Sequence, residues 1–204
     1  VPVAAPLRYE TTEPASTGLE IVGRLSDAAE TGPVFVKDMA YQATGLLTPE
    51  LLGRFTNTFL VRDPLAAVAS FARKWPDITE EEAGYLALEE AYDAALLGSG
   101  PRPVVIEADD LAADPPGMVE AWCRAVGIDF LPEALTWEPG MIEQWVRWRD
   151  WYEGVAASTG FRTPSAGPPP ELGDARLEAI VERARPVYER LVASPGRILA
   201  QRSG

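Results

Sequence analysis

The chain has 204 residues, of which 47% are apolar and 24% are charged. A chain of this size and composition buries a continuous core, which excludes a disordered or fibrous protein and indicates one globular domain. Its 18 basic and 31 acidic residues give a formal net charge of −13, which disfavours a general nucleic-acid or anionic-lipid surface. An anionic ligand must therefore bind at a local basic site.

The sequence contains no histidine and a single cysteine, Cys123. Without histidine, Ser-His-Asp and Cys-His catalysis, imidazole zinc sites and a histidine general base are all excluded. A single cysteine excludes an intrachain disulfide. No calcium loop has suitable ligand spacing, so we expect no metal.

No apolar run approaches the roughly 18 residues that span a bilayer, and the N-terminus carries no charged-then-apolar secretory signal. We therefore expect a cytoplasmic protein with no membrane insertion and no nucleic-acid partner. No pattern in the sequence sets the oligomeric state.

Three apolar runs predict buried strands, and helical patterns lie between them. In chain order we expect a helix at residues 19–29, strands at 33–37 and 58–62, helices at 64–74 and 80–97, a strand at 103–107, a helix at 115–126 and a terminal helix at about 174–200. Continuous apolar strands favour parallel pairing, and their alternation with helices predicts an α/β fold. We expect one domain over residues 1–204, with an α/β core at 1–162, a Pro-rich linker at 163–172 and a C-terminal helix at 173–204.

Helix-capping residues support these boundaries. Asp63-Pro64 and Asp114-Pro115 each place a capping carboxylate before a proline at the first helical position. Thr79 can cap the helix that begins with the acidic run at residues 80–82. Gly127 can end the helix expected at residues 115–126.

Each expected strand ends in charged residues: Lys37-Asp38, Arg62-Asp63, and Glu107 followed by Asp109. In open α/β sheets ligands bind beyond the carboxyl ends of the strands, so these groups either gather at a functional edge or face solvent there.

The helix expected at residues 64–74 separates Ser70 from the core. At 100° per residue, Leu65, Val68 and Ala69 fall on one face, and Ser70 falls on the opposite one. We expect the serine to share its side with an open helix N-terminus, whose unpaired N–H groups favour an anion, next to the Arg62 guanidinium. An ordinary capped surface helix is the alternative.

Arg62-Asp63-Pro64, with Ser70 eight residues after the arginine, resembles the 3′-phosphate-binding motif of sulfotransferases that use 3′-phosphoadenosine 5′-phosphosulfate. Residues 34–40 are similar to the family's strand that ends in a lysine near the reacting centre. Residues 104–111 and 122–128 are similar to its later strand–loop–helix, and residues 158–161 resemble a loop of a bacterial subgroup. The likeness spans about residues 30–162 in the same order.

The resemblance implies a three-layer α/β/α fold of the P-loop NTPase-like type, with a mostly parallel central sheet. It also implies a transferase that moves a sulfuryl group from 3′-phosphoadenosine 5′-phosphosulfate, as co-substrate, to a hydroxyl or amine of a small-molecule acceptor. No metal is implied.

Residue roles follow from the same resemblance. Lys37 would act at the sulfuryl group, and Arg62 with Ser70 would hold the 3′-phosphate of the donor. The loop Ser158-Thr159-Gly160 would also contact the donor. The acceptor proton needs a base whose pKa burial raises toward neutrality, and Asp38 is the first candidate, ahead of Glu107 and Asp109.

The sequence departs from the family in two respects. Nothing before Leu19 matches the family's donor-binding loop, and because the sequence begins at Val1 rather than methionine, we expect this loop to precede Val1. The histidine that often follows the strand-end lysine is absent. A non-catalytic nucleotide-binding or scaffold protein is therefore an alternative, as is another P-loop-type phosphotransferase, although no G-x-x-x-x-G-K-[ST] motif is present.

Aromatic residues crowd residues 137–152. Met141, Trp145, Trp148 and Tyr152 recur at helical spacing, which predicts one stripe on a helix. Such a stripe either packs in the core or lines an acceptor pocket.

Overall fold

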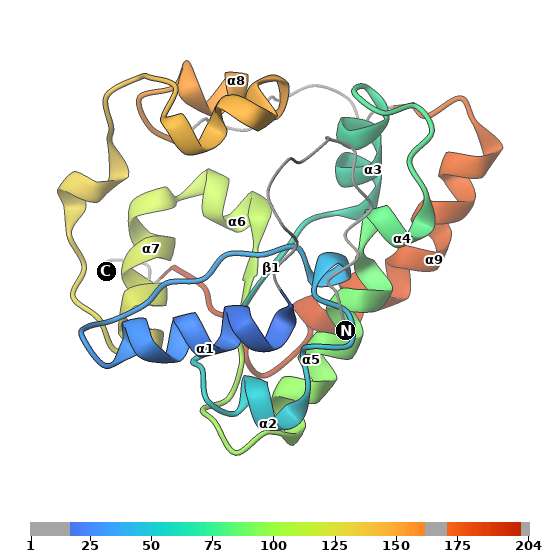
Figure 1. Cartoon of the computed structure of the whole chain (residues 1–204). Helices are drawn as coiled ribbons and strands as arrows, with labels where there is room; N and C mark the ends of the chain where they lie inside the picture. The colour runs from blue at the N-terminus through green and yellow to red at the C-terminus, as the bar shows by residue number, and fades with distance from the viewer. Residues whose placement is uncertain (1–16, 162–170, 201–204) are drawn as a thin grey trace.

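The computed structural model describes residues 17–161 and 171–200 (Figure 1). Residues 163–170, which make up most of the expected linker, lie outside the described residues, as do residues 201–204 of the expected C-terminal segment. Glu171 and Leu172, the end of the expected linker, have irregular structure before the last helix.

Two parallel strands form the centre of the fold. Strand β1 (Thr58–Val61) pairs with β2 (Val104–Glu107), and the register runs from Thr58 beside Val104 to Val61 beside Glu107. Both strands lie where the apolar runs predict them, and their parallel pairing confirms the expectation. Parallel neighbours need a long crossover, which the helices between residues 64 and 97 provide.

A short segment near the end of the chain pairs with the other edge of β2. The Val105 amide donates to the Gly196 carbonyl at 2.9 Å, and the Ile198 amide donates to the Val105 carbonyl at 3.0 Å. The bridge between Val105 and Arg197 is parallel. Strand β2 is therefore hydrogen-bonded on both edges, whereas β1 pairs only with β2 among the described residues.

The strand expected at residues 33–37 is wrong. In the described part of the chain this segment has no strand pairing, and Val34, Phe35 and Val36 are 37%, 78% and 48% exposed. Phe35 contacts Trp122 edge-on, with ring centroids 6.3 Å apart. An apolar run forms a buried strand only where a neighbouring strand pairs with it, and residues 33–37 pair with no strand in the described part of the chain.

The helices surround the sheet. The described α-helices are α1 (Gly18–Ala29), α2 (Pro49–Leu52), α3 (Pro64–Ala72), α4 (Glu80–Ala83), α5 (Tyr85–Leu97), α6 (Ala108–Ala113), α7 (Pro115–Val126), α8 (Arg149–Ala156) and α9 (Ala175–Val192). Short 3₁₀ turns are η1 (Ala40–Gln42), η2 (Pro132–Leu135) and η3 (Glu143–Trp148).

Local capping chemistry sets several of these boundaries as predicted. Asp114 accepts a hydrogen bond from the Gly117 amide at the start of α7, and Gly127 caps its end. Thr79 and Glu82 form a reciprocal capping box at α4. The single helix expected at residues 80–97 is instead two helices, because Gly84 adopts φ +79°, a left-handed conformation that ends α4.

The terminal helix is shorter than expected. It ends at Val192 rather than near Ala200, and the chain then turns to pair with β2. Gly196 makes this pairing possible, since a Cβ atom there would lie 2.1 Å from the Pro103 carbonyl oxygen. Pro195-Gly196 is a turn signal in the sequence, and it outweighs the helical spacing that precedes it.

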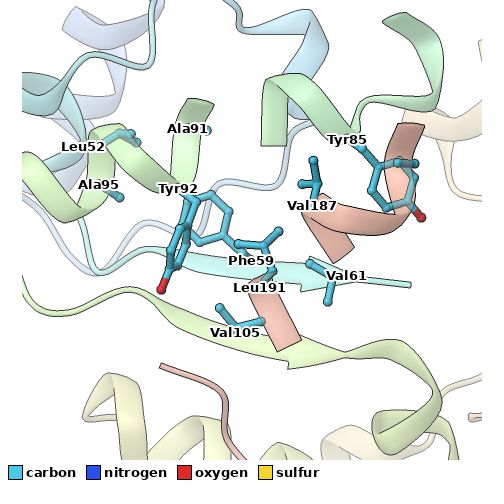
Figure 2. Packing of buried hydrophobic residues seen from close by; sticks show 11 residues of the cluster. Leu52, Phe59, Val61, Tyr85, Ala91, Tyr92, Ala95, Val105, Val187 and Leu191 are labelled. Carbon is cyan, nitrogen blue, oxygen red and sulfur yellow. The ribbon is translucent and has the colours of Figure 1, made fainter. Parts of the chain in front are cut away.

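The main core lies between the sheet and the helices α5 and α9 (Figure 2). Phe59, Val61 and Val105 face it from the strands, and Phe59 meets Tyr92 edge-on at 5.4 Å between ring centroids. Helix α9 contributes apolar residues at helical spacing to this core and to a neighbouring cluster. The buried members from α9 in the described clusters are Leu177, Ile180, Ala184, Val187 and Leu191.

The opposite face of the sheet is only partly covered. Val104 and Ile106 pack against Met118 of α7. On the same face of β1, Leu60 is 56% exposed. Helices therefore cover both faces of β2, which is the α/β arrangement. The full three-layer P-loop NTPase-like fold goes beyond this small sheet and stays a prediction.

The packing of α9 on the sheet can be tested with two leucines. Leu191 is 0% exposed, so Leu191→Ala is expected to lower the free energy of unfolding by about 2–5 kcal/mol because it opens a cavity. Leu97, at the end of α5, is 78% exposed, and Leu97→Ala is expected to change the free energy of unfolding by less than about 0.5 kcal/mol. Urea denaturation measures both, and equal losses would contradict the placement of α9.

Candidate functional site

The carboxyl ends of β1 and β2 bring charged residues together. The register places Val61 beside Glu107, so Arg62 and Asp63 follow β1 at the sheet edge where Glu107 ends β2. For these two strands the predicted gathering of charge at one edge is confirmed. Lys37 and Asp38 are not brought there by a strand, because residues 33–37 lie outside the sheet.

Asp63 begins helix α3. Its Oδ1 accepts hydrogen bonds from the amides of Leu65 at 2.9 Å and Ala66 at 3.2 Å, and the Ala67 amide donates to the Asp63 carbonyl at 2.9 Å. Pro64 has no N–H group. The expectation of an open N-terminus with unpaired amides is therefore wrong. Any anion bound there must be held by side chains.

The second oxygen of Asp63 faces helix α9. Its Oδ2 forms an ion pair with Nη1 of Arg185. Burial alone would raise the pKa of Asp63, but the hydrogen bonds from Arg185 and from the Ala66 amide outweigh it and hold the pKa below its ordinary value. Asp63 is therefore ionised and neutralised by Arg185.

Arg62 has a fixed backbone and an exposed side chain. The Tyr85 hydroxyl donates to the Arg62 carbonyl at 2.6 Å, and Tyr85 itself is 6% exposed. Burial raises the pKa of Tyr85, so the phenol stays protonated as a donor. Within residues 17–161 and 171–200, the Arg62 guanidinium makes no hydrogen bond or ion pair.

Ser70 lies on the outer side of α3, as the helical spacing predicts. Val68 and Ala69 are 1% and 7% exposed, whereas Ser70 is only partly buried. At 1.5 Å per residue, Ser70 is about 9 Å along the helix from Pro64. The Ser70 hydroxyl accepts a hydrogen bond from Arg73 Nη2 at 3.2 Å. A second guanidinium, which the sequence pattern does not single out, therefore lies beside this serine.

Glu107 is the buried carboxylate of the site, with 4% exposure. Its Oε2 accepts from the amides of Asp109 at 2.8 Å and Asp110 at 2.9 Å and so caps α6, and its Oε1 accepts from the Tyr188 hydroxyl at 3.4 Å. Burial raises the pKa of Glu107 above its ordinary value, against the lowering effect of the Asp110 amide. Burial, followed by the nearby Glu107 charge, raises the pKa of Tyr188 to about 12.

Lys37 and Asp38 are both exposed in the segment before η1. The Lys37 ammonium lies 3.8 Å from the Met39 sulfur, and Asp38 Oδ1 accepts from the Met39 amide at 2.7 Å. Their assignment as catalytic residues stays a prediction. The burial that a carboxylate base requires is found at Glu107 rather than at Asp38.

The predicted donor loop at residues 158–160 is tied to residues 136–137. The Ser158 hydroxyl accepts from Trp137 Nε1 at 3.2 Å and donates to the Val155 carbonyl at 2.7 Å. The Thr159 carbonyl accepts from the Trp137 amide at 3.1 Å, and Gly160 forms an antiparallel bridge with Thr136. None of these contacts reaches Arg62 or Ser70, so the role of this loop in donor binding also stays a prediction.

The aromatic residues do not form one helical stripe. Residues 143–148 are a 3₁₀ turn and α8 begins at Arg149, so Met141 lies outside the helix. Trp145 stacks on Tyr152 at 4.9 Å between ring centroids, and Trp151 stacks on Trp75 at 4.8 Å. The side chain of Trp148 lies outside the described part of the structure. The stacks on Tyr152 and Trp75 show that packing occupies much of this aromatic surface.

No group of three or more Cys, Asp or Glu side chains among the described residues is arranged to hold a metal ion. No helix formed by the same residues has both the length and the apolar character needed to cross a membrane.

A family model described as Sulfotransferase domain matches residues 3–194, and the chain belongs to this family. It is 33% identical over 137 residues to branched-chain-amino-acid aminotransferase-like protein 2 of Arabidopsis thaliana. The matched region covers 66% of this chain and 24% of the Arabidopsis protein. This chain is 32% identical over 160 residues to aminotransferase-like protein 1 of the same plant, with 77% and 28% covered. The chain thus spans about a quarter of the length of these relatives. No solved structure matches it.

Sequence reasoning missed the contribution of α5 and α9 to this edge of the sheet. Arg185 pairs with a residue 122 positions away, and Tyr85 bonds to one 23 positions away. The available signal is Tyr188, which lies at helical spacing from the buried Ala184 and Leu191 and has a hydroxyl that usually finds a partner when buried.

The ion pair at Asp63 predicts a pH-dependent stability. Because the pKa of Asp63 is lowered on folding, its ionised form stabilises the fold above the ordinary aspartate pKa, and this contribution is lost as the pH falls through the folded-state value. Asp63→Asn keeps a capping oxygen but loses the charge. We expect it to lower the free energy of unfolding by about 1 kcal/mol at pH 7, a modest value because the pair is partly exposed.

The difference in the free energy of unfolding between Asp63→Asn and the parent should shrink below about pH 4. Urea denaturation at pH 7 and pH 3 measures it, with Asp129→Asn as the control at an exposed aspartate. A difference that is the same at both pH values would rule out the ionised Asp63 as its source.

Proposed function

We propose that this chain transfers a sulfuryl group from 3′-phosphoadenosine 5′-phosphosulfate to a hydroxyl or amine of a small-molecule acceptor. Membership of the sulfotransferase-domain family supports the reaction class. The observation that supports this choice of donor is the exposed Arg62 guanidinium at the carboxyl end of β1. It has no partner among the described residues.

The donor supplies the reason for a guanidinium at this position. A 3′-phosphate is a dianion whose oxygens match the planar fork of arginine. The α3 amides are occupied by Asp63, so Arg62 provides the charge and the Ser70 hydroxyl provides a further donor from the same helix. Arg73, beside Ser70, adds positive charge to this surface.

Sulfuryl transfer builds negative charge on the leaving phosphate, so the enzyme mainly positions the reactants in line and supplies fixed positive charge. In this proposal Lys37 supplies that charge at the sulfuryl group. Asp38, next to Lys37, is the proposed base for the acceptor proton, on the condition that the bound substrates bury this exposed carboxylate. Glu107 is less suited to this step, because two α6 amides and the Tyr188 hydroxyl already use its oxygens.

The names of the two Arabidopsis proteins describe chains of which this chain matches about a quarter. We therefore do not extend an aminotransferase-like activity to this chain. The acceptor can be identified by incubating the protein with radiolabelled donor and an extract of its host and then analysing the labelled product.

Arg62→Ala is expected to weaken the binding of adenosine 3′,5′-bisphosphate more than tenfold, because the charge that holds the 3′-phosphate is lost. Isothermal titration calorimetry measures the affinity. Arg102→Ala is the matched control, because Arg102 is also exposed but precedes β2 at the opposite, amino end of the sheet. Unchanged affinity in Arg62→Ala would refute the phosphate site.

Lys37→Ala is expected to lower the rate at which the radiolabelled sulfuryl group is transferred by about 10²–10³. Its affinity for adenosine 3′,5′-bisphosphate is expected to stay within a few-fold of that of the parent. The reason is that the lysine acts on the sulfuryl group, which the bisphosphate lacks. Lys74, the other lysine of the chain, lies 5.6 Å from the Trp151 ring centroid, and Lys74→Ala provides the control. Equal transfer rates in Lys37→Ala and the parent would exclude the catalytic role.

A further inference from the structure

The site that we propose for the 3′-phosphate contains a negative charge of its own. Asp63 directly follows Arg62, and its carboxylate cannot turn away because Oδ1 accepts from the amides of Leu65 and Ala66. A phosphate held by Arg62, which directly precedes Asp63, and by Ser70 of α3, the helix that Asp63 begins, would experience the charge of this carboxylate. An unpaired carboxylate would cancel much of the attraction that Arg62 provides.

Helix α9 supplies the compensating charge. Arg185 Nη1 pairs with Asp63 Oδ2, the oxygen that the cap leaves free. The Arg185 guanidinium also lies over the Tyr188 ring, 5.8 Å from its centroid, and the Tyr188 hydroxyl bonds to Glu107. Arg185 is therefore held in place from two directions.

Stability alone is a weak reason for this ion pair. The Arg185 and Asp63 side chains are 34% and 29% exposed, and partly exposed pairs contribute little to folding. Helix α9 is already anchored by buried Ala184, Val187 and Leu191 in the main core. The larger effect of the pair is on the local charge next to Arg62.

We infer that Arg185 is a positioning residue for the donor: it neutralises and orients Asp63, so that the Arg62 guanidinium acts as a net positive charge toward the 3′-phosphate. This inference rests on the proposed function. Arg185 does not itself touch the donor, and it acts through Asp63.

Calorimetric titration of the full chain with adenosine 3′,5′-bisphosphate tests the inference. Arg185→Gln leaves the Asp63 charge unpaired and is expected to weaken binding at least about tenfold. Adding Asp63→Asn to that variant removes the unpaired charge while keeping a capping oxygen. The double variant is therefore expected to recover affinity to within about threefold of the parent, as is Arg185→Lys, which keeps the positive charge.

The matched control lies two residues away on the same helix. Arg183 pairs with Glu80, the first residue of α4, at 2.7 Å, so Arg183→Gln breaks an ion pair of the same kind that does not include Asp63. It is expected to leave the affinity unchanged.

The rescue separates an electrostatic role from a structural one. If Arg185 only holds α9 in place, the double variant binds as weakly as Arg185→Gln or more weakly, and the inference is overturned. Unchanged affinity in Arg185→Gln overturns it as well. Should that single variant not fold, the double variant and Arg185→Lys decide, since a tenfold loss in either contradicts the inference. A parent chain without affinity for the bisphosphate would overturn the proposed function too, whereas the other outcomes leave that function standing.

Discussion

A carboxylate at the end of each strand is the constraint on which this edge of the molecule depends. Asp63 starts α3 and Glu107 starts α6, each by accepting two backbone amides. The parallel register brings these acids to the same edge of the sheet. Helix α9 gives each a different partner, a guanidinium for Asp63 and a phenol for Glu107. Their pKa values move in opposite directions: burial raises that of Glu107, whereas at Asp63 the hydrogen bonds from Arg185 and the Ala66 amide outweigh burial and lower it.

Apolar packing determines where these polar partners lie. Arg185 and Tyr188 are three residues apart on α9 and so project from neighbouring positions on one side of the helix. Val187 and Leu191 fix the rotation and height of α9 against β1 and β2, since both are buried in the main core (Figure 2). A change in that packing would displace both polar contacts at once. The charge state of the site therefore depends on a hydrophobic interface that contains no ligand-binding residue.

The sequence predicts those parts of the fold that local chemistry determines. The strands at 58–61 and 104–107 and the caps Asp63 and Asp114 depend on residues within a few positions of one another. Residues 33–37 show the opposite case, because their apolar run required partners that the described structure does not supply. The contact between Arg185 and Asp63 joins residues 122 positions apart, and no local pattern encodes it. Arg62 and Ser70 are identifiable because they belong to one short motif, but the Asp63-Pro64 pair indicates only a helix boundary and does not show that the Asp63 carboxylate occupies the α3 amides.

Net charge alone describes this chain poorly as a binder of anions. With a formal charge of −13, its carboxylates outnumber its basic groups, and arginines such as Arg183, Arg190 and Arg197 are paired with acids on neighbouring elements. A paired guanidinium has little attraction left for a ligand. Arg62 differs because the acid beside it in sequence, Asp63, is taken by α3 and by Arg185. An acidic protein can therefore present a positive group to a phosphate without any basic patch, provided that a second arginine neutralises the nearest carboxylate.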